Sequence, residues 1–241
     1  MGLEKGKVRW GVLGTATIAE NHTLPGMKEA CNCQLYAIAG RDPEKTKRFQ
    51  EKFGFEKTYG SYAELLEDEN VDAVYIPLPN QLHKEWTIKA ARKKKHILCE
   101  KPLAPTVDEV KEVVEICRQE GVILMEAFAY LHSKATREVI QAVRGGAVGK
   151  PLFVETVFMV KPWAKENIRM RKETMGGGTY DQGCYNISLM LNLLDEMPDE
   201  ITAQAHFMEN GVDDFSSIYF HFPSGARGYA ISGMCCGQRA D

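Results

Sequence analysis

One stretch near the N-terminus decides the fold of this chain, and it reads VRWGVLGTATIA from Val8 to Ala19. The mainly apolar residues 8–13 predict a strand, and a helical stretch is expected to run on to about Ala30. Between them lie small residues that let backbone approach a pyrophosphate at a helix N-terminus, as in a dinucleotide site. An ordinary strand-to-helix turn is the open alternative. The candidate phosphate-binding residues are Gly14, Thr15, Ala16, Thr17 and Ile18.

The next strand, Gln34 to Ala39, runs into Gly40-Arg41. An acidic residue at this place grips the ribose hydroxyls of NAD, whereas an arginine suits the 2′-phosphate of NADP. Arg41 therefore favours NADP as the cofactor, with NAD still possible and a solvated loop arginine as the plain alternative. Asp42 is better placed to cap the following helix, with Pro43 as its first residue and Gly54 closing it.

Strands and helices go on alternating up to about Ala127, which is typical of a doubly wound parallel sheet of the Rossmann kind. Capping boxes at Ser61 and Thr106 begin two of these helices. Further strands are expected at Val71 to Ile76, Ile97 to Cys99 and Val122 to Met125. An apolar stripe at helical spacing is assigned to the core, and its members are Val107, Val110, Val113, Val114 and Cys117.

The pattern changes after this point. A helix from about His132 to Arg144 is followed by strands without intervening helices, which implies a mainly antiparallel open sheet. These strands are Leu152 to Val160, Ile201 to Met208, Ser216 to Phe222 and Ala226 to Ser232. We therefore predict an α/β chain with a dinucleotide-binding Rossmann domain over 1–128. An α+β domain for substrate binding and oligomerisation is expected over 129–241.

Glu100, Lys101 and Pro102 follow the strand that ends at Cys99, and proline stops strand pairing there. An acid and a base thus lie at the carboxyl end of a strand, the edge where open α/β sheets bind ligands. A surface ion pair of little energetic weight is the alternative interpretation.

A proline-rich turn follows the strand at Val71 to Ile76, and an extended backbone of this kind suits a wall against a flat ring. Pro77, Leu78 and Asn80 are candidate cofactor contacts, and Asn80 is expected to cap the next helix. His83 on that helix is a further candidate, with a core or capping histidine as the alternative. Glu100 and Lys101 complete the candidate cofactor contacts.

One helix interrupts the later strands, preceded by Gly176-Gly177-Gly178 and running from Thr179 to about Asp195. On a helical wheel Asp181 and Tyr185 lie together, opposite the apolar face that contains Met190. They line either a ligand pocket or a solvent face. The neighbouring loop residues Trp163, Arg169 and Arg171 are candidate substrate contacts or plain surface residues.

Lysine and tyrosine together suit hydride-transfer chemistry. A phenol, with a pKa of about 10, is a poor base at neutral pH, but a nearby ammonium favours the phenolate. Lys101 is the obvious partner for Tyr185. The protein would then take a proton from a hydroxyl while the nicotinamide takes the hydride.

Composition excludes several other classes of protein. A net charge of −3 gives no electrostatic basis for binding nucleic acid or an anionic membrane, and no apolar run reaches membrane-spanning length. The basic run at 92–95 is assigned to the end of a helix, where it complements the helix dipole. Seven scattered cysteines without a Cys-x-x-Cys pair, Cys236 among them, favour reduced thiols and argue against a zinc site. We expect no metal and a cytoplasmic protein without a signal peptide.

Taken together, these motifs resemble the glucose-fructose oxidoreductase, inositol dehydrogenase and rhizopine-catabolism (Gfo/Idh/MocA) oxidoreductases. The matching features, in order, are the turn at 14–19, Pro79-Asn80 with His83, Glu100-Lys101-Pro102, Met125 to Phe128, and the glycine triplet with Asp181 and Tyr185. The similarity covers essentially the whole chain and is strongest to the branch of dimeric dihydrodiol dehydrogenase and NADP-dependent xylose dehydrogenase.

The resemblance implies that Lys101 is catalytic, that its peptide bond to Pro102 is cis, and that Tyr185 donates or accepts the proton. It also implies that Asp181 positions a sugar or diol substrate and that the chain forms a homodimer or larger oligomer through its open sheet. Relatives are longer, so the second domain is expected to be shortened at Asp241. A nicotinamide-binding sensor without turnover and a reductase of imines or enones stay open as alternative functions.

Overall fold

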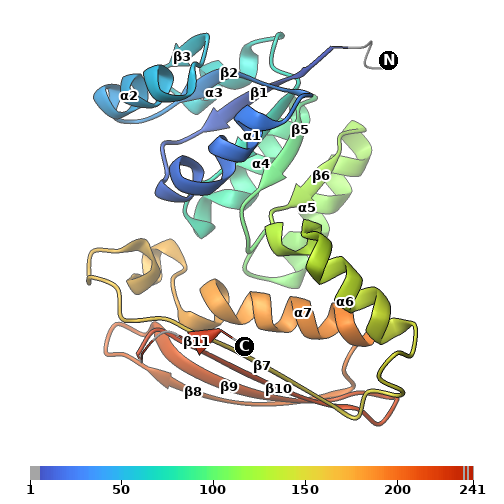
Figure 1. Cartoon of the computed structure of the whole chain (residues 1–241). Helices are drawn as coiled ribbons and strands as arrows, with labels where there is room; N and C mark the ends of the chain where they lie inside the picture. Colours follow the sequence, from blue (N-terminus) through green and yellow to red (C-terminus); the bar gives the residue numbers. More distant parts are fainter. Residues whose placement is uncertain (1–5, 236, 238, 241) are drawn as a thin grey trace. The chain divides into compact units, whose positions relative to one another are not determined.

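The computed structural model describes residues 6–235, 237 and 239–240. The chain divides into two compact units, the first ending at Ala127 and the second beginning at Phe128. Each unit has its own sheet (Figure 1). Cys236 and Asp241 lie outside the described residues.

In the first unit, six described strands form a parallel sheet in the order β3-β2-β1-β4-β5-β6, which confirms the predicted doubly wound fold. The strands are β1 (Val8–Leu13), β2 (Cys33–Ala39), β3 (Lys57–Tyr59), β4 (Ala73–Ile76), β5 (His96–Cys99) and β6 (Leu124–Glu126). The helical segments are η1 (Ala19–Thr23), α1 (Leu24–Glu29), α2 (Pro43–Phe53), α3 (Tyr62–Glu67), η2 (Asn80–Leu82), α4 (His83–Arg92) and α5 (Val107–Glu120).

Both faces of this sheet are buried, because successive strand residues point to opposite sides. On β4, Val74 packs in one core cluster with residues of α3, α4 and α5, whereas Tyr75 packs in another with residues of α1 and α2. The prediction that all five residues of the apolar stripe on α5 lie in the core is wrong for two of them. Val107 is 69% exposed and Val114 is 49% exposed, since only the side of α5 that carries Val113 faces the sheet.

Local signals set most helix ends as predicted. Asp42 accepts a hydrogen bond from the Lys45 amide at the start of α2, and Gly54 ends that helix with a φ of 78°. Ser61 and Thr106 cap α3 and α5. The predicted cap at Asn80 is wrong, because α4 begins after Leu82, which makes no side-chain capping bond.

The basic run acts mainly through pairing after α4 ends at Arg92. Lys93 and Lys94 pair with Glu67 and Glu120, and the buried Lys95 ammonium donates to the carbonyls of Asp68 and Val71. The basic run at 92–95 therefore links the end of α4 to neighbouring segments by ion pairs and hydrogen bonds, in addition to the dipole effect expected from the sequence.

The second unit contains a mixed five-stranded sheet among its described residues, in the order β11-β7-β10-β9-β8. Its strands are β7 (Phe153–Met159), β8 (Glu200–Phe207), β9 (Asp213–His221), β10 (Arg227–Gly233) and β11 (Arg239–Ala240). Its helical segments are η3 (Ala129–His132), α6 (Lys134–Arg144), η4 (Ile168–Met170), η5 (Lys172–Thr174), η6 (Thr179–Gly183) and α7 (Cys184–Leu194).

Helix α7 runs across one face of this second sheet (Figure 1). Met190 is buried there against Ile218 and Phe220 of β9, as the helical wheel predicts. The other face is open: Tyr219 is 56% exposed and stacks on Tyr229 with ring centroids 4.3 Å apart. Residues 223–225 join β9 to β10 in an antiparallel hairpin, whereas the pairing of β10 with β7 is parallel and was not expected.

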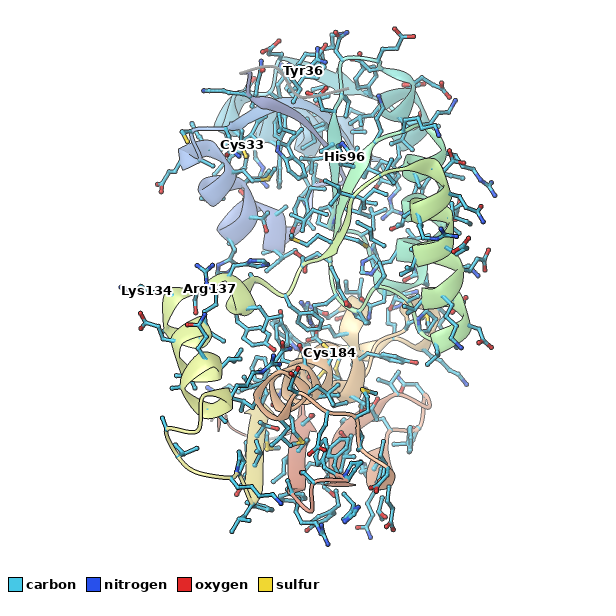
Figure 2. All side chains as sticks on the ribbon, turned by 90° about the vertical axis from the view of Figure 1, so that its right-hand side faces the viewer. Cys33, Tyr36, His96, Lys134, Arg137 and Cys184 are labelled. Atoms are coloured by element: carbon cyan, nitrogen blue, oxygen red, sulfur yellow. The ribbon has the colours of Figure 1, made fainter. Side chains whose placement is uncertain are left out.

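Helix α6 carries charged side chains on its exposed side, among them Lys134 and Arg137 (Figure 2). Arg144 at its end bonds to the carbonyl of Asn192 and pairs with Asp195 after α7. The ends of α6 and α7 are thus tied together within the second unit.

The first helical segment is tied to α2 by a cluster that gives a stability prediction. Arg48 pairs with both carboxylate oxygens of Glu20, Lys52 adds a contact of 2.8 Å, and these cations lower the pKa of Glu20 from 4.5 to about 2. Because the folded-state pKa is the lower one, the ionised group stabilises the fold above pH about 4.5. That stabilisation is lost as the pH falls towards about 2.

Glu20→Gln should therefore lower the Tm by about 2 °C at pH 7 and leave it unchanged near pH 2, because such half-exposed pairs contribute little. Thermal melts followed by circular dichroism across that pH range measure the effect. Glu51→Gln, on an exposed site of α2, serves as the matched control. Equal Tm losses at both pH values would contradict the assignment.

Candidate functional site

The predicted phosphate turn lies directly after β1. Gly14 has a φ of 115°, a backbone conformation that favours glycine. A Cβ atom added at Gly14 would lie 3.1 Å from Cδ2 of Leu78. The helix begins at Thr17, and the side chains of Thr17 and Ile18 are exposed. The turn is thus an accessible helix N-terminus with a backbone path that glycine makes possible, which fits a pyrophosphate.

The strand order places this turn at the switch point of the sheet, where β1 and β4 lie side by side and their connections diverge. Pro77 and Leu78 leave the carboxyl end of β4, and Leu78 meets Gly14. The predicted wall and the predicted phosphate turn are therefore neighbours. Asn80 follows in η2.

Arg41 follows β2 and acts on Tyr62, the first residue of α3. Burial raises the pKa of the Tyr62 phenol, and the charge and hydrogen bond of Arg41 oppose that rise. The Tyr62 hydroxyl oxygen would lie 3.6 Å from a Cβ on Gly14. Arg41, Tyr62 and Gly14 thus gather at one end of the turn, where an exposed guanidinium fits the 2′-phosphate of NADP. Tyr62 was missed by sequence reasoning, because its partners lie far away in the chain.

His83 is fully buried and connects two turns of the first unit. Its Nδ1 lies 2.7 Å from the Pro102 carbonyl oxygen, and its Nε2 lies 2.7 Å from that of Leu78. Two carbonyl acceptors are both satisfied only by an imidazolium, whereas burial lowers the pKa of His83 and favours the neutral ring. His83 therefore supports the wall and the Lys101-Pro102 turn from behind, as a core histidine does.

The Glu100-Lys101 turn lies at the carboxyl end of β5, and the cis peptide bond to Pro102 is present as implied. Glu100 accepts a hydrogen bond of 2.5 Å from the Tyr75 hydroxyl. Burial raises the pKa of Glu126, and the Leu103 amide and the Lys101 charge oppose that rise. An ammonium thus stands near carboxylates of β5 and β6, at the edge where ligands bind.

In the second unit, Asp181 and Tyr185 are held by different neighbours. The Asp181 carboxylate accepts hydrogen bonds from Nε of Arg169 at 2.7 Å and from the Gln182 amide at 2.5 Å. The Arg169 guanidinium in turn lies 4.9 Å from the ring centroid of Trp163. The structure thus brings Trp163 and Arg169 to Asp181, whereas Arg171 pairs with Glu173.

The half-buried Tyr185 ring is packed edge-on among three aromatic rings, those of Phe128, Tyr130 and Phe158, at centroid distances of 5.5 to 5.9 Å. Its face of the helix is therefore walled by aromatic groups and is no open solvent face. Cys184, the residue before it, begins α7 (Figure 2). The aromatic wall was missed because its members come from two segments, around η3 and in β7, that lie far from Tyr185 in the sequence.

Contacts inside the second unit explain why glycine is needed in the triplet at 176–178. A Cβ on Gly177 would collide with the Asp213 carboxylate, and Gly177 has a φ of 129°. Asp213 accepts hydrogen bonds from the amide and the hydroxyl of Thr179, at 2.7 and 2.8 Å. The triplet thus lets the start of η6 close onto β9, which fixes where Asp181 and Tyr185 begin their helix.

Two sequence-based exclusions can be compared with the described residues. In that part of the chain, no group of three or more His, Cys, Asp or Glu side chains could hold a metal ion. No described helix is long and apolar enough to cross a membrane. Cys99 and Cys117 carry free thiols, and burial raises the pKa of both.

The fold and the turn at the switch point define a dinucleotide-binding protein of the Rossmann class with a second α/β unit. Residues 8–128 match the model of an oxidoreductase family with an NAD-binding Rossmann fold. Residues 136–241 match the GFO/IDH/MocA C-terminal domain. The chain belongs to the Gfo/Idh/MocA oxidoreductase family.

Individual relatives show how far the likeness extends. The chain is 36% identical to D-xylose 1-dehydrogenase (NADP⁺) 2 of Haloferax volcanii, over 90% of this chain and 66% of that protein. It is 32% identical to trans-1,2-dihydrobenzene-1,2-diol dehydrogenase of Xenopus tropicalis, over 93% and 68%. The chain thus spans about two thirds of the length of these curated relatives.

Among solved structures, the chain resembles a 3-ketoreductase from Actinomadura kijaniata in complex with NADP and TDP-benzene. The TM-score is 0.91 at 31% identity, covering 97% of this chain and 72% of that one. It also resembles an aldose-aldose oxidoreductase from Caulobacter crescentus complexed with glycerol, with a TM-score of 0.90 at 28% identity, covering 96% and 72%.

Proposed function

We propose that the chain is an NADP-dependent oxidoreductase that moves a hydride between the nicotinamide and a hydroxyl-bearing carbon of a sugar or cyclic diol. The observation that carries this proposal is the position of Glu100-Lys101 in this chain, which belongs to the Gfo/Idh/MocA family. The pair leaves β5 in the same sheet whose switch point holds Gly14, Leu78 and the Arg41–Tyr62 pair.

The predicted cofactor contacts that precede β5 each have a task in this proposal. The backbone of residues 14–18 holds the pyrophosphate, and Arg41 takes the 2′-phosphate. Pro77 and Leu78 form the wall for the nicotinamide with Asn80 beside it, and His83 supports that wall through the Leu78 carbonyl. Bound NADP supplies the hydride acceptor or donor.

Two side chains are assigned to the proton in this proposal. Lys101 and Tyr185 bind the substrate hydroxyl and move its proton, with Glu100 orienting the Lys101 ammonium. Asp181, itself held by Arg169, orients a second hydroxyl of the substrate. The aromatic rings around Tyr185 hold its ring and so fix the direction of its phenol.

The named activities of relatives support this choice of substrate. They include a xylose dehydrogenase, a dihydrodiol dehydrogenase and several reductases of dTDP-linked keto sugars. Solved variants of the Actinomadura 3-ketoreductase replace a lysine by alanine or glutamate and a tyrosine by phenylalanine. The xylose, the dihydrodiol and the keto sugars in the names of these relatives all carry a hydroxyl or carbonyl on a carbon next to another oxygenated carbon.

A substrate screen tests the proposal. Purified chain is mixed with NADP⁺ and a panel of aldoses and dihydrodiols, and in reverse with NADPH and keto sugars, imines or enones, while the nicotinamide absorbance is followed. We expect turnover with at least one vicinally oxygenated substrate. Tight NADPH binding without any turnover would instead support the nicotinamide-binding sensor, and turnover of imines or enones alone would support the third function.

Arg41 gives a sharper test of cofactor choice. Arg41→Ala should weaken NADPH binding about tenfold to a hundredfold and leave NADH binding within about twofold, because only NADPH carries the 2′-phosphate. Fluorescence titration measures both dissociation constants. Arg48→Ala, a nearby arginine paired with Glu20, is the matched control and should change neither. An equal loss for both nucleotides would contradict the role of Arg41.

The proposal extends to assembly and location. The open face of the second sheet, with its stacked Tyr219 and Tyr229, is the surface through which a homodimer or larger oligomer would form. The protein would work in the cytoplasm with a small-molecule substrate and without nucleic acid. Sedimentation of the purified chain tests the oligomeric state.

A further inference from the structure

Tyr75 is a fully buried tyrosine with two polar partners. It lies on β4 and packs in a core cluster with Val12, Leu24 and Phe49, where a phenylalanine would fill nearly the same space. Its hydroxyl lies 2.5 Å from Oε1 of Glu100 and 2.9 Å from Oγ1 of Thr23. The hydroxyl, and not the packing, therefore distinguishes this residue.

The hydrogen bonds have a defined direction. Burial raises the pKa of the Tyr75 phenol far above its usual range, and the Glu100 charge adds to that rise, so the phenol keeps its proton. A carboxylate only accepts hydrogen bonds, so that one proton is donated to Glu100. The Tyr75 oxygen then accepts a hydrogen bond from the Thr23 hydroxyl, so a series of hydrogen bonds runs from Thr23 through Tyr75 to Glu100.

This series of hydrogen bonds joins two parts of the candidate site. Thr23 ends η1, in the helical stretch that follows the phosphate turn, and Glu100 directly precedes Lys101. His83 of α4 and Glu126 of β6 also face this turn: the charges of Glu100 and Lys101 act on the pKa of His83, and the charge of Lys101 acts on that of Glu126. A carboxylate that is free to turn would take different positions among these charges, whereas one held by a rigid core phenol has a single position.

We propose that Tyr75 is a positioning residue for Lys101, acting through Glu100. Its hydroxyl holds the Glu100 carboxylate in place, and that carboxylate orients the Lys101 ammonium towards the substrate hydroxyl. The effect on turnover rests on the proposed function, whereas the hydrogen bond itself does not.

The kinetic test uses Tyr75→Phe, which keeps the ring and removes the hydroxyl. We expect kcat to fall about tenfold, since a hydrogen bond to a charged group is lost, while the Kd for NADPH changes less than about twofold. Thr23→Val removes only the outer bond and should lower kcat by about twofold to threefold. A Tyr75→Phe protein with the parent's kcat would overturn the proposal.

A double-mutant cycle separates positioning from a general structural effect. In a Glu100→Gln background the carboxylate is gone, so adding Tyr75→Phe should lower kcat no further. Effects of the two substitutions that simply multiply would overturn the proposal, because Tyr75 would then act independently of Glu100.

A spectroscopic test keeps the proposal separate from the proposed function. A buried phenol proton shared with a carboxylate should give a far-downfield, slowly exchanging proton NMR resonance in the full chain. We expect Tyr75→Phe and Glu100→Gln each to remove it, and Thr23→Val to shift it. If Tyr75→Phe fails to fold, the other two variants still decide. The proposed hydrogen bonds are overturned if the parent protein lacks the resonance, or if the Glu100→Gln variant still shows it. A parent with the resonance but no turnover contradicts only the proposed function.

Discussion

Lys101→Met is expected to lower turnover by about a thousandfold while NADPH binding stays within about threefold of the parent. Methionine keeps most of the length of the side chain and removes the charge that acts on the substrate hydroxyl. The position supports a large effect, since Lys101 leaves the carboxyl end of β5 beside two carboxylates, Glu100 and Glu126. Single-turnover kinetics with saturating NADPH measure the loss directly.

The control for this variant is another lysine of the same unit. Lys89 lies on α4, pairs with Glu85 and rests over the Trp86 ring, on the outside of the sheet. Lys89→Met should leave both turnover and NADPH binding unchanged. A Lys101→Met protein with more than about a tenth of the parent's turnover would remove Lys101 from the proton transfer.

The second large effect is expected for Tyr185→Phe, which should lower kcat by about a hundredfold or more with little change in NADPH binding. The ring stays packed among Phe128, Tyr130 and Phe158, so only the hydroxyl is lost. A general acid or base that is removed in this way commonly costs two to four orders of magnitude in rate, or about 3 to 5 kcal/mol.

Tyr219→Phe is the matched control, because Tyr219 lies on the open face of the second sheet, stacked on Tyr229. It should keep the parent's turnover. The Tm of Tyr185→Phe should stay near that of the parent, so that a rate loss reports chemistry. Turnover equal to the parent's with the true substrate would show that Tyr185 does not handle the proton.

The first unit could be predicted in detail because its signals are local. The strand, the small-residue turn and the helix occur within residues 8–30, and Asp42, Ser61 and Thr106 cap helices as their side chains suggest. The edge strand β3 was missed, because three residues that follow a helix carry little periodicity. The parallel pairing of β7 with β10 was missed because it joins segments about seventy residues apart.

Predictions failed where tertiary contacts overrule the local pattern. Val107 and Val114 fit a helical stripe, but only part of that stripe reaches the sheet. Asn80 has the chemistry of a helix cap, yet a short 3₁₀ turn places Leu82 there instead. Among the candidate site residues, Gly14, Arg41 and Lys101 could be proposed from their order in the chain. Tyr62 and Tyr75 could not, since their partners lie more than twenty residues away.

Fluorescence titration of the purified chain with NADPH and NADH tests the central claim most directly, because every step of the proposed reaction requires a nicotinamide cofactor whose pyrophosphate lies at the turn after β1. We predict saturable binding of NADPH that is at least about tenfold tighter than that of NADH, consistent with an arginine at position 41. Failure of both nucleotides to bind would contradict the proposed activity as a whole.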